Sequence, residues 1–249
     1  MGDGNAFGLK TEKLYEILDL IAYYFPECER INMDATVTSI LHKSQEELEM
    51  LARKKVKHLY LGIESGLDDV LKFMKKDHDL AQAYQAIDRL HEAGLIYDAH
   101  IMTGVAGKGR GMENAEALAQ FLNRTNPAHV VNFSMFLHKE VPLYQDIRQG
   151  TFVPADELET IREEYHLIER IAPEKAGANI LYDGFHDFIH VRVRGHLPDD
   201  KEKMLAKLSG IIQEYEGKEP VYSFVQGECP DLEYCDDGKA VWDMDRKTS

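Results

Sequence analysis

Apolar runs of strand length alternate with amphipathic helical stretches along the first part of the chain. Four runs read as strands, and they extend from Arg30 to Val37, His58 to Ser65, Leu95 to Val105 and His129 to Leu137. Between them, apolar residues recur every three or four positions, as in helices that bury one face. Strands that alternate with helices in this way predict βαβ units and a parallel sheet.

Capping and breaking residues delimit the helices. Ser44 and Glu47 form a capping box, Gly94 is placed to end a helix, and Asn126-Pro127 stops another. The expected helices cover residues 11–25, 45–52, 67–75, 79–93 and 112–124. After Pro142 the pattern changes to a short helix, a long helix through Ile171, two extended stretches at 180–182 and 188–194, and a helix from 199.

These elements predict an α/β fold, with a soft domain boundary near residue 175. Residues 1–174 form the βα unit and residues 175–249 a small C-terminal α+β extension with an acidic tail. A length of 249 residues suits one main domain, since βα barrels often take about 200 to 250 residues.

Charge and composition exclude several classes of protein. The chain has 29 basic and 44 acidic residues, a net charge of -15, which disfavours binding to a nucleic-acid backbone. No apolar stretch approaches the roughly 18 residues of a membrane span, and the N-terminus lacks the pattern of a signal peptide. Three scattered cysteines do not make a disulfide framework. We therefore expect a cytoplasmic protein that does not bind membranes.

Polar groups follow several of the strands, at the point where each strand ends. Asp34, Glu64 and His100 occupy such positions, and Gly2-Asp3-Gly4 resembles a loop that joins a strand to a helix, although the strand in front of it is absent. Because the active sites of parallel α/β folds lie at the carboxyl ends of their strands, these residues should share one rim. Taken singly, Glu64 and Asp34 could also be satisfied by nearby backbone groups, and His100 could be a core histidine.

These blocks together resemble the radical S-adenosylmethionine (SAM) superfamily, in particular its elongator-type and oxygen-independent coproporphyrinogen oxidase-type branch. The resemblance covers roughly residues 1–171. It rests on Gly2-Asp3-Gly4-Asn5-Ala6-Phe7, Met33-Asp34-Ala35, Gly62-Ile63-Glu64-Ser65-Gly66, the block from Val70 to His78, and the run from His100 to Val105. The block around Glu64, which corresponds to the fourth strand of the family's barrel, is the most specific part.

The resemblance implies a partial (β/α)6 TIM-like barrel that lacks its first βα unit and binds SAM across its mouth. The implied site comprises Gly2, Asp3, Gly4, Asp34, Glu64, Ser65, Lys76 and His100. The glycine loop would receive the methionine amino group, with Asp34 nearby. Glu64 takes a polar cofactor position, Lys76 replaces an arginine on the methionine carboxylate, and His100 stands where some relatives place an aspartate on the ribose.

The family's [4Fe-4S] cluster is a second implied cofactor, but its ligands are absent from this chain. The cluster is held by cysteines spaced C-x3-C-x2-C after the first strand, and no such spacing occurs among Cys28, Cys229 and Cys235. We expect the sequence to be a truncated piece of a complete enzyme; a natural barrel without its first unit is the alternative. The family also implies a reductant such as flavodoxin or ferredoxin.

Two further clusters could carry chemistry. The run from Gly104 to Gly111 could cradle a phosphate, yet it lacks the order of a P-loop or dinucleotide motif and suits a rim loop. His186, His190 and His196 could bind zinc, whereas the intervening Arg192 and Arg194 favour a polar patch that meets a substrate or the rim. Cys229 and Cys235, in the acidic tail, could hold an auxiliary metal.

Three functions follow from these patterns. The leading one is a radical SAM enzyme, or a fragment of one, that generates a 5'-deoxyadenosyl radical to abstract hydrogen from an unknown substrate. The second is a cluster-free barrel that acts as a binding or regulatory module. The third is a metal-dependent hydrolase built on the strand-end carboxylates.

Overall fold

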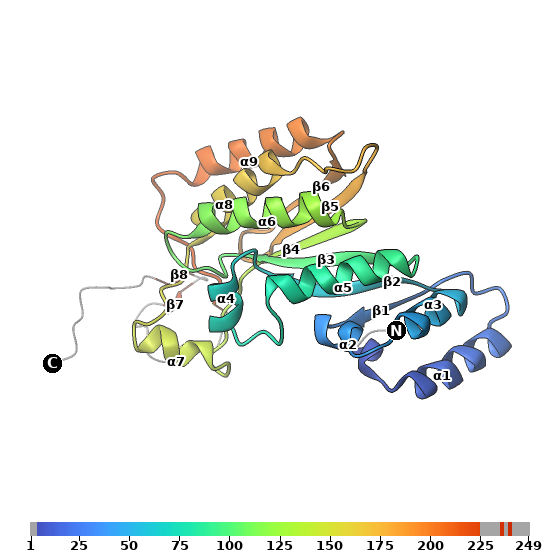
Figure 1. The fold of residues 1–249 in the computed structure, drawn as a ribbon. Coiled ribbons are helices and arrows are strands. Elements are labelled where there is room, and N and C mark those ends of the chain that lie inside the picture. The colour runs from blue at the N-terminus through green and yellow to red at the C-terminus, as the bar shows by residue number, and fades with distance from the viewer. Residues whose placement is uncertain (1–3, 225–234, 237–238, 241–249) are drawn as a thin grey trace.

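Six strands form a single curved sheet in chain order (Figure 1). The computed structural model describes residues 4–224, 235–236 and 239–240. The strands are β1 (Ile31–Ala35), β2 (Val56–Glu64), β3 (Ile96–Thr103), β4 (His129–Ser134), β5 (Ile180–His186) and β6 (Val191–Leu197). β1 to β5 are parallel and β6 is antiparallel to β5. The α/β fold of a partial barrel is therefore confirmed.

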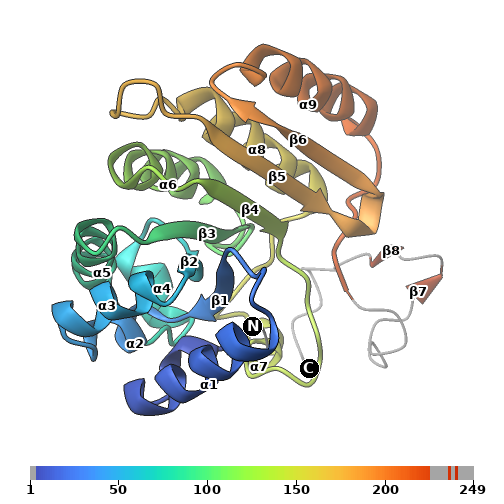
Figure 2. The same ribbon diagram turned by 90° about the vertical axis from the view of Figure 1, so that its right-hand side faces the viewer.

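Helices cover one side of the sheet, which we call the outer side. The sheet curves so that its concave side faces away from these helices (Figure 2). The α-helices are α1 (Thr11–Tyr24), α2 (Val37–Leu41), α3 (Gln45–Arg53), α4 (Asp68–Phe73), α5 (Leu80–Glu92), α6 (Gly111–Thr125), α7 (Leu143–Arg148), α8 (Glu157–Arg170) and α9 (Lys201–Tyr215). Short 3-10 turns are η1 (Ala6–Gly8) and η2 (Asp187–Ile189), and a separate pair of strands comprises β7 (Cys235–Asp236) and β8 (Lys239–Ala240). None of the helices in the described ranges is long and apolar enough to cross a membrane.

Alternation along each strand separates two faces of the sheet. On β2, Leu59, Leu61 and Ile63 are fully buried against the helices, which forms the core. The residues that alternate with them, such as His58 and Tyr60, are partly exposed on the opposite side. We call this opposite side the inner face. It is the side that a closed barrel would enclose.

Most strand boundaries differ by a few residues from those expected, and two of the differences have a clear local cause. The first strand ends at Ala35, because Thr36 caps a new helix: its hydroxyl accepts a hydrogen bond from the amide of Ser39, whose side chain reciprocates. A capping box outweighs the alternation of the preceding residues. The stretch at 188–194 is not extended throughout, since η2 turns the chain between β5 and β6.

The sheet continues beyond the expected boundary near residue 175. β5 pairs with β4 over five register positions, from His129 with Leu181 to Phe133 with Phe185. β6 is the last strand and forms the edge of the sheet, and α9 packs on its outer side. The extension therefore contributes two strands to the same inner face as the first half of the chain.

Candidate functional site

The end of β2 holds Glu64 in a left-handed backbone conformation, with φ of +63°. The amide of Ser65 donates to the carbonyl oxygen of Ile63 at 2.8 Å, which makes a tight turn centred on Glu64. Such a turn is costly for a residue other than glycine, and strain of this kind concentrates at functional sites. The turn directs the Glu64 carboxylate across the end of its own strand.

The position of the Glu64 carboxylate leaves no room for a side chain at Gly62. A β-carbon at Gly62 would lie 2.4 Å from Oε1 of Glu64 and 3.2 Å from Nζ of Lys76. Lys76, which follows α4, donates to the same carboxylate oxygen at 3.2 Å, and about a quarter of each side chain is exposed. The mouth of the half-barrel therefore presents a carboxylate and an ammonium group side by side.

Asp34 lies on the inner face of β1, and the chain before α1 approaches the same rim. Asp34 pairs in register with Tyr60 of β2 and is partly exposed. Gly4 is exposed with φ of +91°, and nothing lies within 4 Å of where its β-carbon would be. Gly2 and Asp3, the other two members of the expected glycine loop, lie outside the described residues.

His100 belongs to a row of rings on the inner face. Its imidazole lies 5.5 Å from the ring of Tyr60 on one side and 6.1 Å from Phe133 on the other, centre to centre. Phe133 stacks on Phe185 at 5.6 Å, and the guanidinium group of Arg192 lies 4.8 Å from the Phe185 ring. We call these five side chains the inner row; it runs from β2 to β6.

Ser65 is fully buried, and its hydroxyl holds the turn instead of facing the rim. It donates to Oδ1 of Asn114 at 2.6 Å, and the same oxygen accepts from the amide of Gly66. The Asn114 amide in turn donates to Glu163 on α8 at 2.7 Å. The other oxygen of Glu163 accepts from the amide of Gly104, after β3, at 2.8 Å. Glu163 thus links the ends of two strands.

Two more carboxylates of α8 fix the ends of the later strands through His186. Nδ1 of this fully buried histidine lies 2.9 Å from Oε2 of Glu157, and Nε2 lies 3.1 Å from Oε2 of Glu164. Glu164 also accepts from Asn132 and Tyr182 on β4 and β5. We call Glu157, Glu163, Glu164 and His186 the α8 cluster. Sequence reasoning missed its three carboxylates.

Burial sets the protonation states within the α8 cluster. It raises the pKa of Glu163 to about 8, although hydrogen bonds from Asn114 and Gly104 oppose the shift. For His186 burial disfavours the charge, but the bonds to Glu157 and Glu164 outweigh it and raise its pKa to about 10. At neutral pH the imidazolium therefore donates to both carboxylates.

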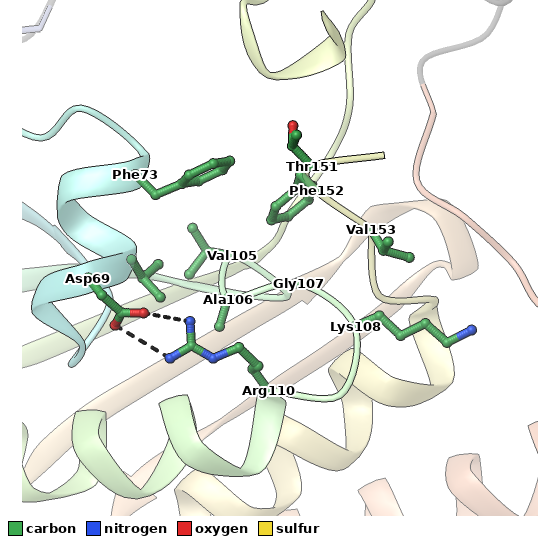
Figure 3. Close-up of a pocket in the computed structure, with 11 residues that line it drawn as sticks. Asp69, Phe73, Val105, Ala106, Gly107, Lys108, Arg110, Thr151, Phe152 and Val153 are labelled. Atoms are coloured by element: carbon green, nitrogen blue, oxygen red, sulfur yellow. Dashed lines mark hydrogen bonds and ion pairs between the residues drawn. The ribbon is translucent and has the colours of Figure 1, made fainter. Parts of the chain in front are cut away.

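The glycine-rich loop after β3 is a rim loop whose amides are used within the protein. The amide of Lys108 donates to the Val153 carbonyl at 2.8 Å, and that of Gly109 donates to Glu159. Figure 3 shows this loop beside a hollow of about 380 Å³, whose lining includes Phe73 and Phe152. Arg110, at the rim of this hollow, donates two hydrogen bonds to Asp69, whereas the side chain of Lys108 points away from the hollow. The amides of Gly104, Gly107 and Arg110 are also bonded within the protein, so five amides of this loop already have acceptors.

The three histidines expected to share a face do not converge. His186 points to the outer side of the sheet, His190 sits at the end of η2, and the imidazole of His196 bonds to Asn179. Within the described ranges, no group of three His, Cys, Asp or Glu side chains could hold a metal ion. The zinc hypothesis is therefore wrong for these histidines. Cys229 lies outside the described residues, and of Cys235 the structure gives only that it begins β7.

Residues 2–122, which carry Asp34, Glu64, Lys76 and His100, match the radical SAM superfamily. These residues belong to that superfamily. Radical SAM proteins use S-adenosylmethionine and a [4Fe-4S] cluster, as the sequence blocks implied. The expected superfamily is confirmed.

The chain is also similar to individual proteins. The tRNA uridine(34) acetyltransferase of Methanocaldococcus infernus is 25% identical over 119 residues, which are 47% of this chain and 22% of that protein. The solved structure of the archaeal Methanocaldococcus infernus Elp3 with an N-terminal deletion matches at a TM-score of 0.61 and 16% identity. This match covers 85% of this chain and 53% of the other, and it shows the shared fold. Methylornithine synthase matches at 0.47 and 15% identity, over 81% and 63% of the two chains.

The residues present fit one of the two radical SAM cofactors. The partly exposed carboxylate of Glu64, in a strained turn, and the ammonium group of Lys76 beside it suit the amino-acid end of SAM. The [4Fe-4S] cluster has no set of cysteine ligands here, because the sequence has no C-x3-C-x2-C spacing. Cys28 precedes β1. Its thiol bonds to the Arg30 carbonyl at the opposite end of the sheet from Glu64. The described residues do not fit the cluster.

Proposed function

We propose that this chain forms the SAM-binding wall of a radical SAM enzyme. The observation that carries the proposal is the strained turn at Glu64, with Lys76 against it and Gly62 leaving room for it. In this family, SAM bound to the reduced cluster supplies a 5'-deoxyadenosyl radical, which takes a hydrogen atom from a substrate. The electron would come from a one-electron donor such as flavodoxin or ferredoxin.

Each strand-end side chain has a proposed part in holding the cofactor. Glu64 and Asp34 would accept hydrogen bonds from the methionine ammonium, together with the backbone of the loop at Gly2, Asp3 and Gly4. Lys76 would exchange part of its contact with Glu64 for the methionine carboxylate. His100 would meet the ribose, and the rings beside it would exclude water. Ser65 would act indirectly, by fixing the turn through Asn114.

Binding of SAM to the full chain tests the site without any radical chemistry. We expect calorimetry to show binding that Glu64→Gln and Asp34→Asn each weaken by about tenfold, the loss of a charge-assisted hydrogen bond. Glu16→Gln on the exposed surface of α1 is the matched control. If Glu64→Gln and Glu16→Gln bind SAM equally, the proposed site is wrong.

An assay for SAM cleavage distinguishes a radical SAM enzyme from a cluster-free binding module. A protein in which this chain is joined to a C-x3-C-x2-C segment, reconstituted anaerobically with iron and sulfide, should convert SAM to 5'-deoxyadenosine when reduced. Tight SAM binding without cleavage would favour a cluster-free module. Hydrolysis of a test ester that depends on added metal would favour the hydrolase.

A further inference from the structure

Lys43, between α2 and α3, carries a buried positive charge. It is 6% exposed, and no other lysine or arginine in the described ranges is as deeply buried. Its ammonium group donates to the carbonyl oxygen of Leu9 at 3.0 Å and lies 5.0 Å from the centre of the Phe7 ring. Among the described residues it forms no ion pair with a carboxylate. Because buried charges in proteins are normally paired, this ammonium group is short of an anion.

Two acidic residues nearby compensate this charge only in part. Burial lowers the pKa of Lys43, although Glu47 and Glu12 oppose the shift. The Glu47 carboxylate is already used in the capping box of α3, where it accepts from the amide of Ser44 at 2.6 Å. An ammonium group has three N–H donors, and within the described part of the chain only one of those of Lys43 has an oxygen acceptor. The Phe7 ring can take a second, so at least one donor remains for a ligand.

A polar hollow of about 320 Å³ lies beside Lys43. Lys43 and Leu9, which the hydrogen bond joins, both line it, together with Lys10 and His42. None of the described residues in its lining is Asp or Glu, although the chain has 44 acidic residues. α1 begins beside the hollow at Thr11 without a side-chain cap, so the amides of its first turn add positive potential. The hollow therefore suits an oxyanion.

We propose that this hollow binds a phosphate group, as the free ion or as a monoester, through Lys43. Lys10 and His42 are exposed at the same hollow and share the second negative charge of the phosphate. Several cationic donors around one group suit a dianion better than a single carboxylate. The hollow is larger than one phosphate ion, which leaves room for the alcohol part of an ester. None of the described residues assigned to SAM lines it, so this inference goes beyond the proposed function and stands without it.

Calorimetric titrations of the full chain in phosphate-free buffer test the site at constant ionic strength. The probes are inorganic phosphate and glycerol 3-phosphate, with acetate and glycerol as controls for the charge and for the alcohol. We expect both phosphates to bind about tenfold more tightly than acetate, and glycerol not to bind. Tighter binding of glycerol 3-phosphate would identify a monoester as the ligand, and tighter binding of inorganic phosphate would identify the free ion.

Lys43→Met is the decisive variant, because it keeps an unbranched side chain over Phe7 and removes only the charge. It should lower the affinity for phosphate about tenfold. In phosphate-free buffer its urea midpoint should be no lower than that of the wild type, since the buried charge lacks a partner there. Lys10→Gln, a surface change, should weaken phosphate binding about threefold. Lys13→Gln is the matched control on the same helix, with its side chain 61% exposed and outside the lining.

Three results would overturn the proposal. They are the absence of phosphate binding, equal affinities for phosphate and acetate, and equal effects of Lys43→Met and Lys13→Gln. SAM binding keeps this site apart from the proposed cofactor site, since Lys43→Met should leave it unchanged and Glu64→Gln should leave phosphate binding unchanged. If Lys43→Met weakens the binding of SAM and not that of phosphate, Lys43 belongs to the cofactor site and the phosphate site is wrong.

Discussion

Raising the pH from 7 to 9 should destabilise this protein through the α8 cluster. His186 is held as an imidazolium between Glu157 and Glu164, and Glu163 is held largely protonated by burial. Both groups bind their protons more tightly in the folded chain than in the unfolded one. Folding is therefore favoured by protons, and the free energy of unfolding falls as the solution becomes alkaline.

The sign and size follow from the two shifted groups. The contribution of His186 is complete below pH 6.5, its ordinary pKa, and is lost as the pH rises through about 10. That of Glu163 is complete below 4.5 and lost as the pH rises through about 8. Between pH 7 and 9, linkage assigns about 2 to 3 kcal/mol to His186 and about 1 kcal/mol to Glu163.

Urea unfolding followed by far-UV circular dichroism measures the effect at constant ionic strength. Wild-type protein should lose about 3 to 4 kcal/mol of unfolding free energy over this interval. Glu163→Gln should be less stable at neutral pH, because its amide faces the donors of Asn114 and Gly104. Its pH slope should nevertheless be shallower by about 1 kcal/mol. The surface control Glu16→Gln should keep the wild-type slope.

A flat profile would refute the reasoning. If the unfolding free energy changes by less than about 1 kcal/mol from pH 7 to 9, His186 is not a buried imidazolium. If Glu163→Gln and Glu16→Gln have the same slope, Glu163 does not take up a proton on folding.

Three substitutions test the strand ends directly. Gly62→Ala should displace the Glu64 carboxylate, so calorimetry should show SAM affinity falling as far as in Glu64→Gln while the thermal midpoint changes little. Glu64→Gly should relieve the left-handed turn, raising the urea-derived unfolding free energy by about 1 kcal/mol while SAM binding weakens; a loss of stability would contradict the strain. Asn114→Ala should cost about 2 to 4 kcal/mol in urea unfolding, because Ser65, Gly66 and Glu163 lose partners; a change below about 1 kcal/mol would mean that the strand ends are held otherwise.

Alternation and helical periodicity were sufficient to predict the order of the elements and the strand that ends at Glu64. They also placed Asp34, Glu64 and His100 at one rim, since the carboxyl ends of parallel strands lie along one edge of a sheet. What they could not supply is the register between neighbouring strands, which brings His100 edge-on to Phe133. The positive φ of Glu64 could not be predicted from the sequence either, because glycine is the only residue type that commonly indicates this conformation.

The α8 cluster was missed because its carboxylates resemble those of a solvated helix. One signal was present: Glu157, Ile161, Glu164 and Ile168 share a single helical stripe, so two carboxylates occupy positions of the buried apolar face. A carboxylate on such a stripe requires a buried partner. The partner, His186, lies in a strand that sequence patterns assigned to a separate extension.

The pairing of α8 with His186 bears on how this protein could be shortened and how it is made. A fragment that stops at residue 174 would keep Glu157 and Glu164 but lose His186 and Tyr182, leaving two carboxylates in an apolar core. We therefore expect such a fragment to be insoluble or loosely packed. On the ribosome, α8 would reach its final packing only after β5 has been synthesised and has docked.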